Sequence, residues 1–178
     1  MKRNLIVVMG SVLITLAGFV AVNALSIGQE VTNVNIKDAN NQPASIPDFG
    51  SKVLTIVYGD KEAADFSDPI SDALKAKKFP DSKQRGIGIA NLKDSFAPDS
   101  VIRFMVRKKI EKYQVTVLTD VDLTFPRTWG IGDCNNKSVF IVVGKDKKIK
   151  YFKGFSKNNK PNQADIDAIV SLVSNLVK

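Results

Sequence analysis

Few residues in this chain can take part in chemistry, and a single thiol is the most reactive of them. The 178 residues include one Cys, Cys134, and no His. Without His, the chain has no Ser-His or Cys-His nucleophilic pair, no His-bound zinc and no imidazole acid-base catalyst. Because one thiol cannot form an intramolecular disulfide, a reactive Cys134 would need a partner thiol on another molecule.

Two charged neighbours act on the Cys134 thiol in opposite directions. Asp133 would raise the pKa of this thiol, and Lys137 would lower it. Two interpretations therefore stay open. Cys134 is either a small, half-buried residue without a chemical role, which is the commoner case, or a candidate reactive thiol that forms a disulfide with a partner.

Carboxylates gather in one short segment between residues 60 and 65. This segment carries Asp60, Glu62 and Asp65. Acidic residues at the start of a helix are stabilised by the positive end of the helix dipole, and this role needs no chemistry. Asp60, Asp65 and Asp120 would also suit a two-carboxylate hydrolase or a hard-metal site, but no EF-hand spacing is present. We therefore expect no metal site and no cofactor.

The amino terminus predicts export. Lys2 and Arg3 precede an uncharged apolar run, Leu5 to Val22. Val22-Asn23-Ala24 then supplies small residues at the two positions that a signal peptidase reads, so cleavage is expected after Ala24. We expect a signal peptide over residues 1–24 and an exported domain over residues 25–178. Because the apolar run is nearly long enough to span a bilayer, an uncleaved anchor in the inner membrane is the alternative.

Lysines are concentrated in the segment from residue 145 to residue 160, within a chain of net charge +8. They fit a solvated edge hairpin, in which lysines discourage pairing between sheets. The alternative is attraction to an anionic surface. The lysines that would contact it are Lys145, Lys147, Lys148 and Lys150. Nucleic acid is not an expected partner of an exported protein that lacks interleaved aromatic residues.

Hydrophobic periodicity predicts the elements that position these residues. Strands are expected at 53–58, 86–90, 115–119, 138–143 and 149–152, and helices at 63–78, 98–110, 121–130 and 162–177. A polar turn at 38–43 predicts a hairpin before the first long strand. Helices that alternate with buried strands require parallel pairing, and the closing hairpin adds antiparallel strands. The predicted fold class is therefore α/β, a mixed β-sheet flanked by helices, with an amino-terminal β-hairpin extension.

This order of elements resembles the redoxin branch of the thioredoxin superfamily. The motifs that carry the resemblance are Gly28–Val31, the turn at 38–43, Gly50–Leu54, Thr128–Ile131 and the turn at 144–146. The chain is most similar to YtfJ-type exported proteins of Gram-negative bacteria, which lack the redox Cys-x-x-Cys pair. The resemblance implies a thioredoxin-like sheet and a periplasmic location.

The chain departs from the redoxin pattern at both functional loops. Where Cys-x-x-Cys would join the first long strand to its helix, the residues are Asp60, Lys61, Glu62 and Ala63. Where a cis-proline would precede the strand at 138, the chain has Lys137 and Ser138, so we expect a trans peptide. The resemblance then implies a non-catalytic protein that binds an envelope protein or peptide. The alternatives are a thiol-redox role for Cys134 and a membrane-surface role.

Overall fold

The computed structural model describes residues 24–178, and every strand and helix given below lies in this part of the chain. The expected signal peptide or anchor falls on residues 1–24, so all of it except Ala24 lies outside the described residues. Within residues 24–178, none of the helices has both the length and the apolar character needed to cross a membrane.

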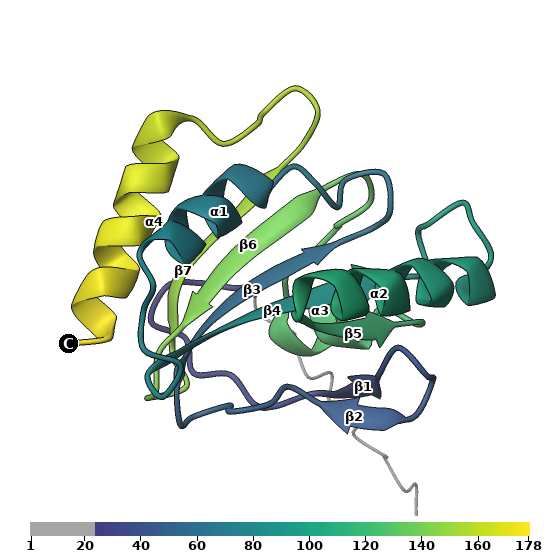
Figure 1. Cartoon of the computed structure of the whole chain (residues 1–178), viewed down its shortest axis with the longest axis horizontal. Helices are drawn as coiled ribbons and strands as arrows, with labels where there is room; N and C mark the ends of the chain where they lie inside the picture. Colours follow the sequence, from purple (N-terminus) through teal and green to yellow (C-terminus); the bar gives the residue numbers. More distant parts are fainter. Residues whose placement is uncertain (1–23) are drawn as a thin grey trace, which may run out of the picture.

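A mixed sheet of seven strands forms the centre of the domain (Figure 1). The strands are β1 (Asn35–Lys37), β2 (Pro43–Ser45), β3 (Val53–Gly59), β4 (Gln84–Asn91), β5 (Thr116–Asp120), β6 (Ser138–Val143) and β7 (Ile149–Phe155). The helices are α1 (Asp68–Ala76), α2 (Asp99–Tyr113), α3 (Thr124–Trp129) and α4 (Gln163–Leu176). The strand order β2-β1-β5-β4-β3-β6-β7 confirms the predicted α/β class and the amino-terminal hairpin.

Parallel and antiparallel pairs divide the sheet as the sequence predicts. β3 pairs with β4, and β4 with β5, in parallel, because α1 and α2 carry the chain back between them. β6 and β7 form the closing antiparallel hairpin, and β6 also pairs antiparallel with β3. At the other side of the sheet, β1 pairs antiparallel with β5.

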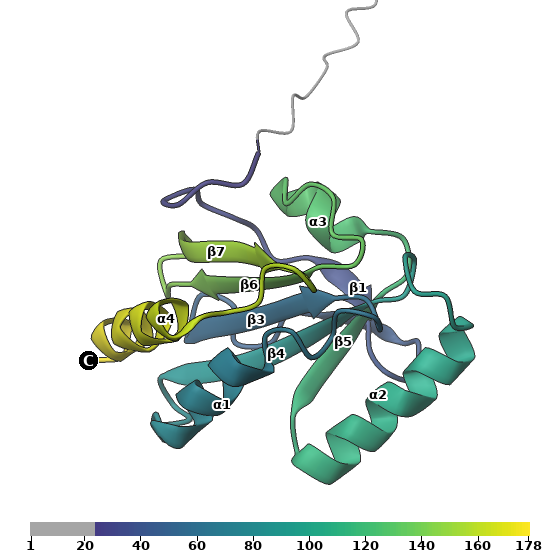
Figure 2. The same cartoon turned by 90° about the horizontal axis from the view of Figure 1, so that it is seen from above.

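Apolar side chains bury both faces of the sheet. Leu54 and Ile56 of β3 belong to the cluster that contains Trp129 of α3, whereas Val53 packs in the cluster that contains Ile169 of α4. Figure 2 shows α1, α2 and α4 on one side of the sheet and α3 on the other. Since the sheet, its helices and three apolar clusters are all formed by residues 24–178, this part of the chain has a complete core of its own.

The first helix is shorter than the predicted one, which covers residues 63–78. α1 begins at Asp68, so Ser67 holds the cap position and Asp68 is the first helical residue. The Ser67 hydroxyl makes no capping bond, because it lies 2.6 Å from the hydroxyl of Ser138. The Ser67 side chain therefore makes a tertiary contact with β6 in place of a local helix cap.

The last helix is capped by Asn162, the first residue of the predicted helix. The Asn162 side chain accepts a hydrogen bond from the backbone N–H of Asp165 at 2.9 Å. The Asp165 carboxylate accepts the Asn162 N–H in return, at 3.2 Å. This capping box satisfies two backbone donors that the helix cannot satisfy internally.

We predict that Asn162→Ala lowers the free energy of unfolding by about 1 kcal/mol, because one helix N–H loses its acceptor. The measurement is urea unfolding followed by circular dichroism. Gln163→Ala is the control at the next, exposed position, where a change within about 0.5 kcal/mol is expected. Equal effects of the two substitutions would show that the cap does not stabilise the fold.

Candidate functional site

The carboxyl ends of the parallel strands meet at one edge of the sheet, and the expected redox loop starts there. The strand register places Gly59 of β3 beside Ala90 of β4, and Asn91 beside Asp120 of β5. On its other side, Gly59 pairs with Ser138, the first residue of β6. The loops that follow β3 and precede β6 are therefore neighbours.

The contact between these two loops leaves little room for a side chain at Gly59. A Cβ atom at Gly59 would lie 3.1 Å from the backbone carbonyl oxygen of Lys137 and 3.4 Å from the Cα atom of Ser138. The structure thus brings the predicted redox-loop positions and the predicted proline-loop positions, Lys137 and Ser138, side by side. All peptide bonds within residues 24–178 are trans.

Asp60, which occupies the first redox-loop position, ties the two loops together. Its side chain is buried, with the residue 1% exposed. Oδ1 accepts the N–H of Ala63 at 2.9 Å, and Oδ2 accepts the N–H of Asn136 in the loop before β6. Burial raises the pKa of the Asp60 carboxyl, and the two N–H donors partly oppose this rise. The carboxylate is therefore a structural link at the place where a redoxin would carry a thiol.

The rest of the redox loop is fixed through its backbone. The N–H of Lys61 donates to the Ser95 hydroxyl at 3.1 Å, and this hydroxyl donates to the carbonyl of Asn91 at 2.7 Å. The Lys61 and Glu62 side chains are exposed, whereas Ala63 is buried. Two of the four loop positions therefore face solvent and can contact a partner.

Cys134 is fully buried instead of half-buried. It is 3% exposed and belongs to the core cluster that contains Tyr58 and Phe125. Its thiol donates a weak hydrogen bond to the carbonyl of Gly132 at 3.5 Å. Burial, and next the charge of Asp133, raise the pKa of Cys134 to about 12. A thiol with this pKa is almost entirely protonated at neutral pH, so it is a poor nucleophile.

Lys137 opposes this rise in the pKa of Cys134, as predicted, but burial and the charge of Asp133 both have larger effects. Its ammonium group lies 3.0 Å from the Asp133 carboxylate and donates to the Asp133 carbonyl as well. The two charges that the sequence places around the thiol are thus paired with each other. Desolvation of the thiol remains the dominant effect.

Asp120 has a separate structural role and does not join the other carboxylates. It accepts the backbone N–H groups of Thr124 and Phe125 at the start of α3, at 3.0 and 2.9 Å. It also accepts the hydroxyl of Tyr58 at 3.3 Å. Asp65, the third carboxylate of the imagined hydrolase or metal site, is exposed. Within residues 24–178, no three metal-ligating side chains gather at one point.

Sequence reasoning missed the polar residues that complete this edge. Asn91 is fully buried and donates to the carboxylate of Asp94 at 2.7 Å, while the Asp94 N–H donates back to the amide of Asn91. Ser67 is also fully buried and is joined to Ser138. The sequence does contain one indication of Asn91: it is a polar residue directly after the apolar residues of a predicted parallel strand.

A small open pocket lies beside the redox loop, between the start of α1 and the segment before α4. It has a volume of about 300 Å³ and is lined by Asp65, Phe66, Pro69, Lys160 and Pro161. The Lys160 ammonium lies 6.0 Å from the centre of the Phe66 ring. The lining of this pocket therefore combines an aromatic ring, two prolines and one charge of each sign.

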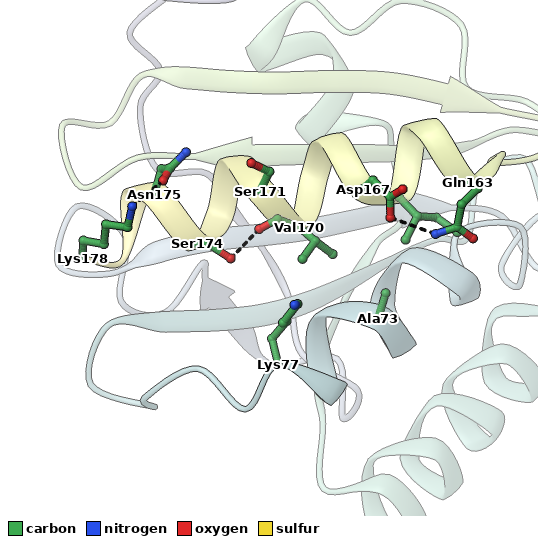
Figure 3. A pocket seen from close by; sticks show the side chains of 10 residues that line it. Ala73, Lys77, Gln163, Asp167, Val170, Ser171, Ser174, Asn175 and Lys178 are labelled. Carbon is green, nitrogen blue, oxygen red and sulfur yellow. Dashed lines mark hydrogen bonds between the residues drawn. The ribbon is translucent and has the colours of Figure 1, made fainter.

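A second pocket, of about 470 Å³, follows the groove between α1 and α4 (Figure 3). Ala73 of α1 and Lys77, directly after this helix, line it on one side, and Val170 and Ser174 of α4 line it on the other. The Ser174 hydroxyl donates to the carbonyl of Val170, so this polar group is already satisfied within the helix. The pocket contains none of the residues that the sequence singled out.

The predicted lysine hairpin lies away from this edge. β6 starts at Ser138, at the redox-loop edge, so the β6–β7 turn stands at the opposite edge of the sheet. Lys145, Lys147 and Lys148 are exposed in this turn, and Lys150 is paired with Asp146 at 2.6 Å.

Comparison with known proteins supports the architecture. No protein-family model and no curated protein sequence matches the chain. Solved structures do match. A peroxiredoxin-like protein from Aquifex aeolicus is 14% identical, with a TM-score of 0.62 over 87% of this chain and 90% of that chain. A thiol peroxidase from Chromobacterium violaceum is 14% identical, with a TM-score of 0.61 over 86% of this chain and 88% of that chain.

An exported protein is among these structural neighbours. The pneumococcal exposed lipoprotein thioredoxin from Streptococcus pneumoniae is 12% identical, with a TM-score of 0.58 over 82% of this chain and all of that chain. The fold is thioredoxin-like. At these identities the likeness concerns the fold, and the thioredoxin-like domain still differs from a thiol oxidoreductase in its own residues at the redox loop.

We predict that a thiol reagent does not label Cys134 in the native protein at neutral pH. Labelling should be at least about a hundredfold slower than in denaturant, because the pKa of about 12 leaves little thiolate and the sulfur is buried. Mass spectrometry of the labelled protein measures this, and Cys134→Ser is the unlabelled control. Rapid, complete labelling of the native protein would contradict the prediction.

We predict that the contribution of Asp60 to the free energy of unfolding decreases as the pH rises. Because burial raises the pKa of Asp60 in the folded state, the folded protein holds this proton at pH values where the unfolded chain has released it. The advantage of wild type over Asp60→Asn in free energy of unfolding should therefore shrink between about pH 4 and about pH 7. Urea unfolding at several pH values measures it.

Asp133→Asn is the control, because the pKa of Asp133 is shifted in the opposite direction to that of Asp60. The N–H of Asn135 and the Lys137 ammonium lower the pKa of the Asp133 carboxyl, so its contribution to stability is lost as the pH falls. As the pH rises, the advantage of wild type over this variant should grow up to about pH 4 to 5, near the pKa of a carboxyl in the unfolded chain, and stay level above that pH. The same trend in both variants would contradict our assignment of the Asp60 pKa.

Proposed function

We propose that this protein is a non-catalytic thioredoxin-like protein of the periplasm, which binds an envelope protein or peptide. The binding surface would be formed by the exposed part of the redox loop and the pocket around Phe66. The observation that carries the proposal is the burial of the Cys134 thiol. The chain has both loops that form the active site of a redoxin. Its one sulfur, in Cys134, is buried, and its raised pKa keeps the thiol protonated at neutral pH.

The redox loop supports binding without catalysis for a second reason. An attacking sulfur would stand at the start of the loop, where its thiolate is stabilised by the helix that follows. Asp60 holds this position and already accepts two backbone N–H groups. A redox alternative that acts through Cys134 would need the loop before β6 to open and expose the sulfur. Two contacts oppose that opening. Asp60 accepts the N–H of Asn136 in this loop, and Ser67 is hydrogen-bonded to Ser138 at the end of it.

The pocket around Phe66 supports a peptide as the ligand. Its prolines and aromatic ring bind through apolar contact, and Asp65 and Lys160 can each pair with an opposite charge on the ligand. The pocket borders the redox loop, so a bound chain that leaves it could continue along Lys61 and Glu62. These residues are exposed and their backbone is held in place through Ser95.

The proposed location rests on the amino-terminal sequence. Cleavage after Ala24 would make Leu25 the first residue of the mature protein. Leu25 is the first buried residue of the described chain, and its backbone nitrogen donates to the carbonyl of Gly130 at 2.8 Å. A cut at this point would leave the whole core in the mature domain. Membership of the YtfJ-type subgroup is part of this proposal and rests on the sequence motifs.

A photoreactive residue in place of Phe66 tests the proposal in intact cells. We predict crosslinking to one protein or peptide species in the periplasmic fraction, with the mature chain beginning at Leu25. The same probe at Ile27, which is 67% exposed and lies outside the pocket, is the matched control and should give no such species. The crosslink should persist unchanged in Cys134→Ser, because the thiol does not contact the partner.

Three results would contradict the proposed function. They are crosslinking of the same species at Ile27, loss of the crosslink in Cys134→Ser, and catalytic reduction of insulin or consumption of hydrogen peroxide by the purified protein. The second and third would support the thiol-redox alternative, and the first would show that contact at Phe66 is not specific.

A further inference from the structure

The outer side of α2 exposes apolar side chains that no part of the described chain covers. Among residues 24–178, six large hydrophobic residues are exposed, and five of them lie in α2 or in the loop that leads into it. They are Phe96, Val101, Phe104, Met105 and Tyr113. Phe96 is the most exposed, at 87%, and Phe104 is 54% exposed. Scattered single residues of this kind are ordinary, but a concentration on one helix is not.

Three of these residues and two lysines form a stripe along the helix, which we call the α2 stripe: Val101, Phe104, Met105, Lys108 and Lys112. These positions lie on one side of the helix, because residues three and four apart are neighbours on a helix surface. The opposite side packs on the sheet through Ile102, Val106 and Ile110. Figure 2 shows α2 at the margin of the molecule.

The α2 stripe combines its apolar residues with positive charge. α2 contains five basic residues against two acidic ones. Two of the basic residues serve the fold, since Arg103 and Arg107 donate to the backbone carbonyls of Asp38 and Ala39. Lys108, Lys109 and Lys112 remain exposed.

The exposed lysines lie along aromatic rings of the same helix. The Lys108 ammonium is 5.9 Å from the centre of the Phe104 ring, and the Lys112 ammonium is 4.9 Å from the centre of the Tyr113 ring. Lys108 also approaches Glu111 at 3.4 Å, but both side chains are well exposed, so this ion pair is weak. Lysine stems beside aromatic rings are the arrangement that lets ammonium groups reach outward past an apolar surface.

We infer that α2 is a membrane-contact helix that lies on an anionic phospholipid surface. Apolar and aromatic side chains on one side of a helix enter the boundary between headgroups and acyl chains, while lysines beside them reach the anionic headgroups. The inference goes beyond the proposed function, because the α2 stripe shares no residue with the pocket around Phe66.

Charge complementarity favours lipid over the other occupants of this surface. A second copy of the chain would bring one basic stripe against another, which is repulsive. An acidic protein would have to bury Lys108 and Lys112 in the centre of its interface, where lysine is depleted. A lipid surface accepts both features at once, since its headgroups are charged and its interior is apolar.

Cosedimentation with vesicles tests the inference on residues 24–178, which contain the complete core and lack the apolar leader run. We expect binding to vesicles of equal parts phosphatidylglycerol and phosphatidylcholine, and none to phosphatidylcholine alone. The double substitution Lys108→Glu and Lys112→Glu should weaken binding by about tenfold or more, because each lysine near an anionic surface contributes several-fold. Phe104→Ser should weaken binding without changing the net charge.

Lys145→Glu with Lys148→Glu is the matched control, because it makes the same change of charge in the β6–β7 turn. Its binding should stay within about twofold of wild type, since the turn is remote from α2. Circular dichroism and thermal unfolding check that each variant is folded, which is expected at exposed positions.

Four results of the vesicle assay would overturn the inference. They are equal binding to neutral and anionic vesicles, absence of binding to both, an equal loss in the turn control, and retention of full binding by Phe104→Ser. A wild-type dimer that dissociates in Phe104→Ser, or binding to polyglutamate without binding to vesicles, would also overturn it and would assign the α2 stripe to a protein partner. None of these results bears on crosslinking at Phe66.

Discussion

The hydrogen bonds of the buried Asp60 carboxylate hold the carboxyl edge of the sheet together. One side chain accepts an N–H from its own loop, at Ala63, and one from the loop before β6, at Asn136. A buried carboxylate is unfavourable unless donors replace the water that it loses, so the two loops and the acid depend on each other. The Ser67–Ser138 contact joins the same two segments a second time. These two contacts therefore hold the loop after β3 against the segment that contains Cys134.

This closed edge follows from the sheet order. Three parallel strands must end on the same side, and the antiparallel strand β6 must begin there. The polar residues Asp60, Asn91 and Asp120 come directly at or after the strand ends, where the backbone leaves the ladder and offers unpaired N–H groups. Each of them accepts or donates hydrogen bonds in a turn or helix start. Thiol chemistry is not needed to explain why polar residues stand at this edge.

Much of the fold could be predicted from the sequence, whereas the state of the thiol could not. Periodicity located the strands and helices, and Asn162 identified the start of α4 because a cap is a local feature. Asp133 and Lys137 are local too, and they indicated opposite pKa shifts of similar weight for Cys134. Burial of Cys134 comes from residues distant in the sequence, such as Tyr58, and it decides the pKa. The bond from Asn136 to Asp60 also joins distant segments, so no spacing rule reveals it.

The proposed binding surface and the membrane-contact helix are connected by the loop between β4 and α2. Ser95 in this loop accepts the N–H of Lys61, and α2 starts four residues later, at Asp99. An α2 helix that lies on a membrane would therefore hold the redox loop within a short distance of the lipid surface. A peptide ligand near a membrane would then meet the Phe66 pocket in two dimensions instead of three, which raises its effective concentration without any new contact. In this arrangement the redox loop and the Phe66 pocket would bind a peptide without thiol chemistry, and α2 would keep them beside the membrane.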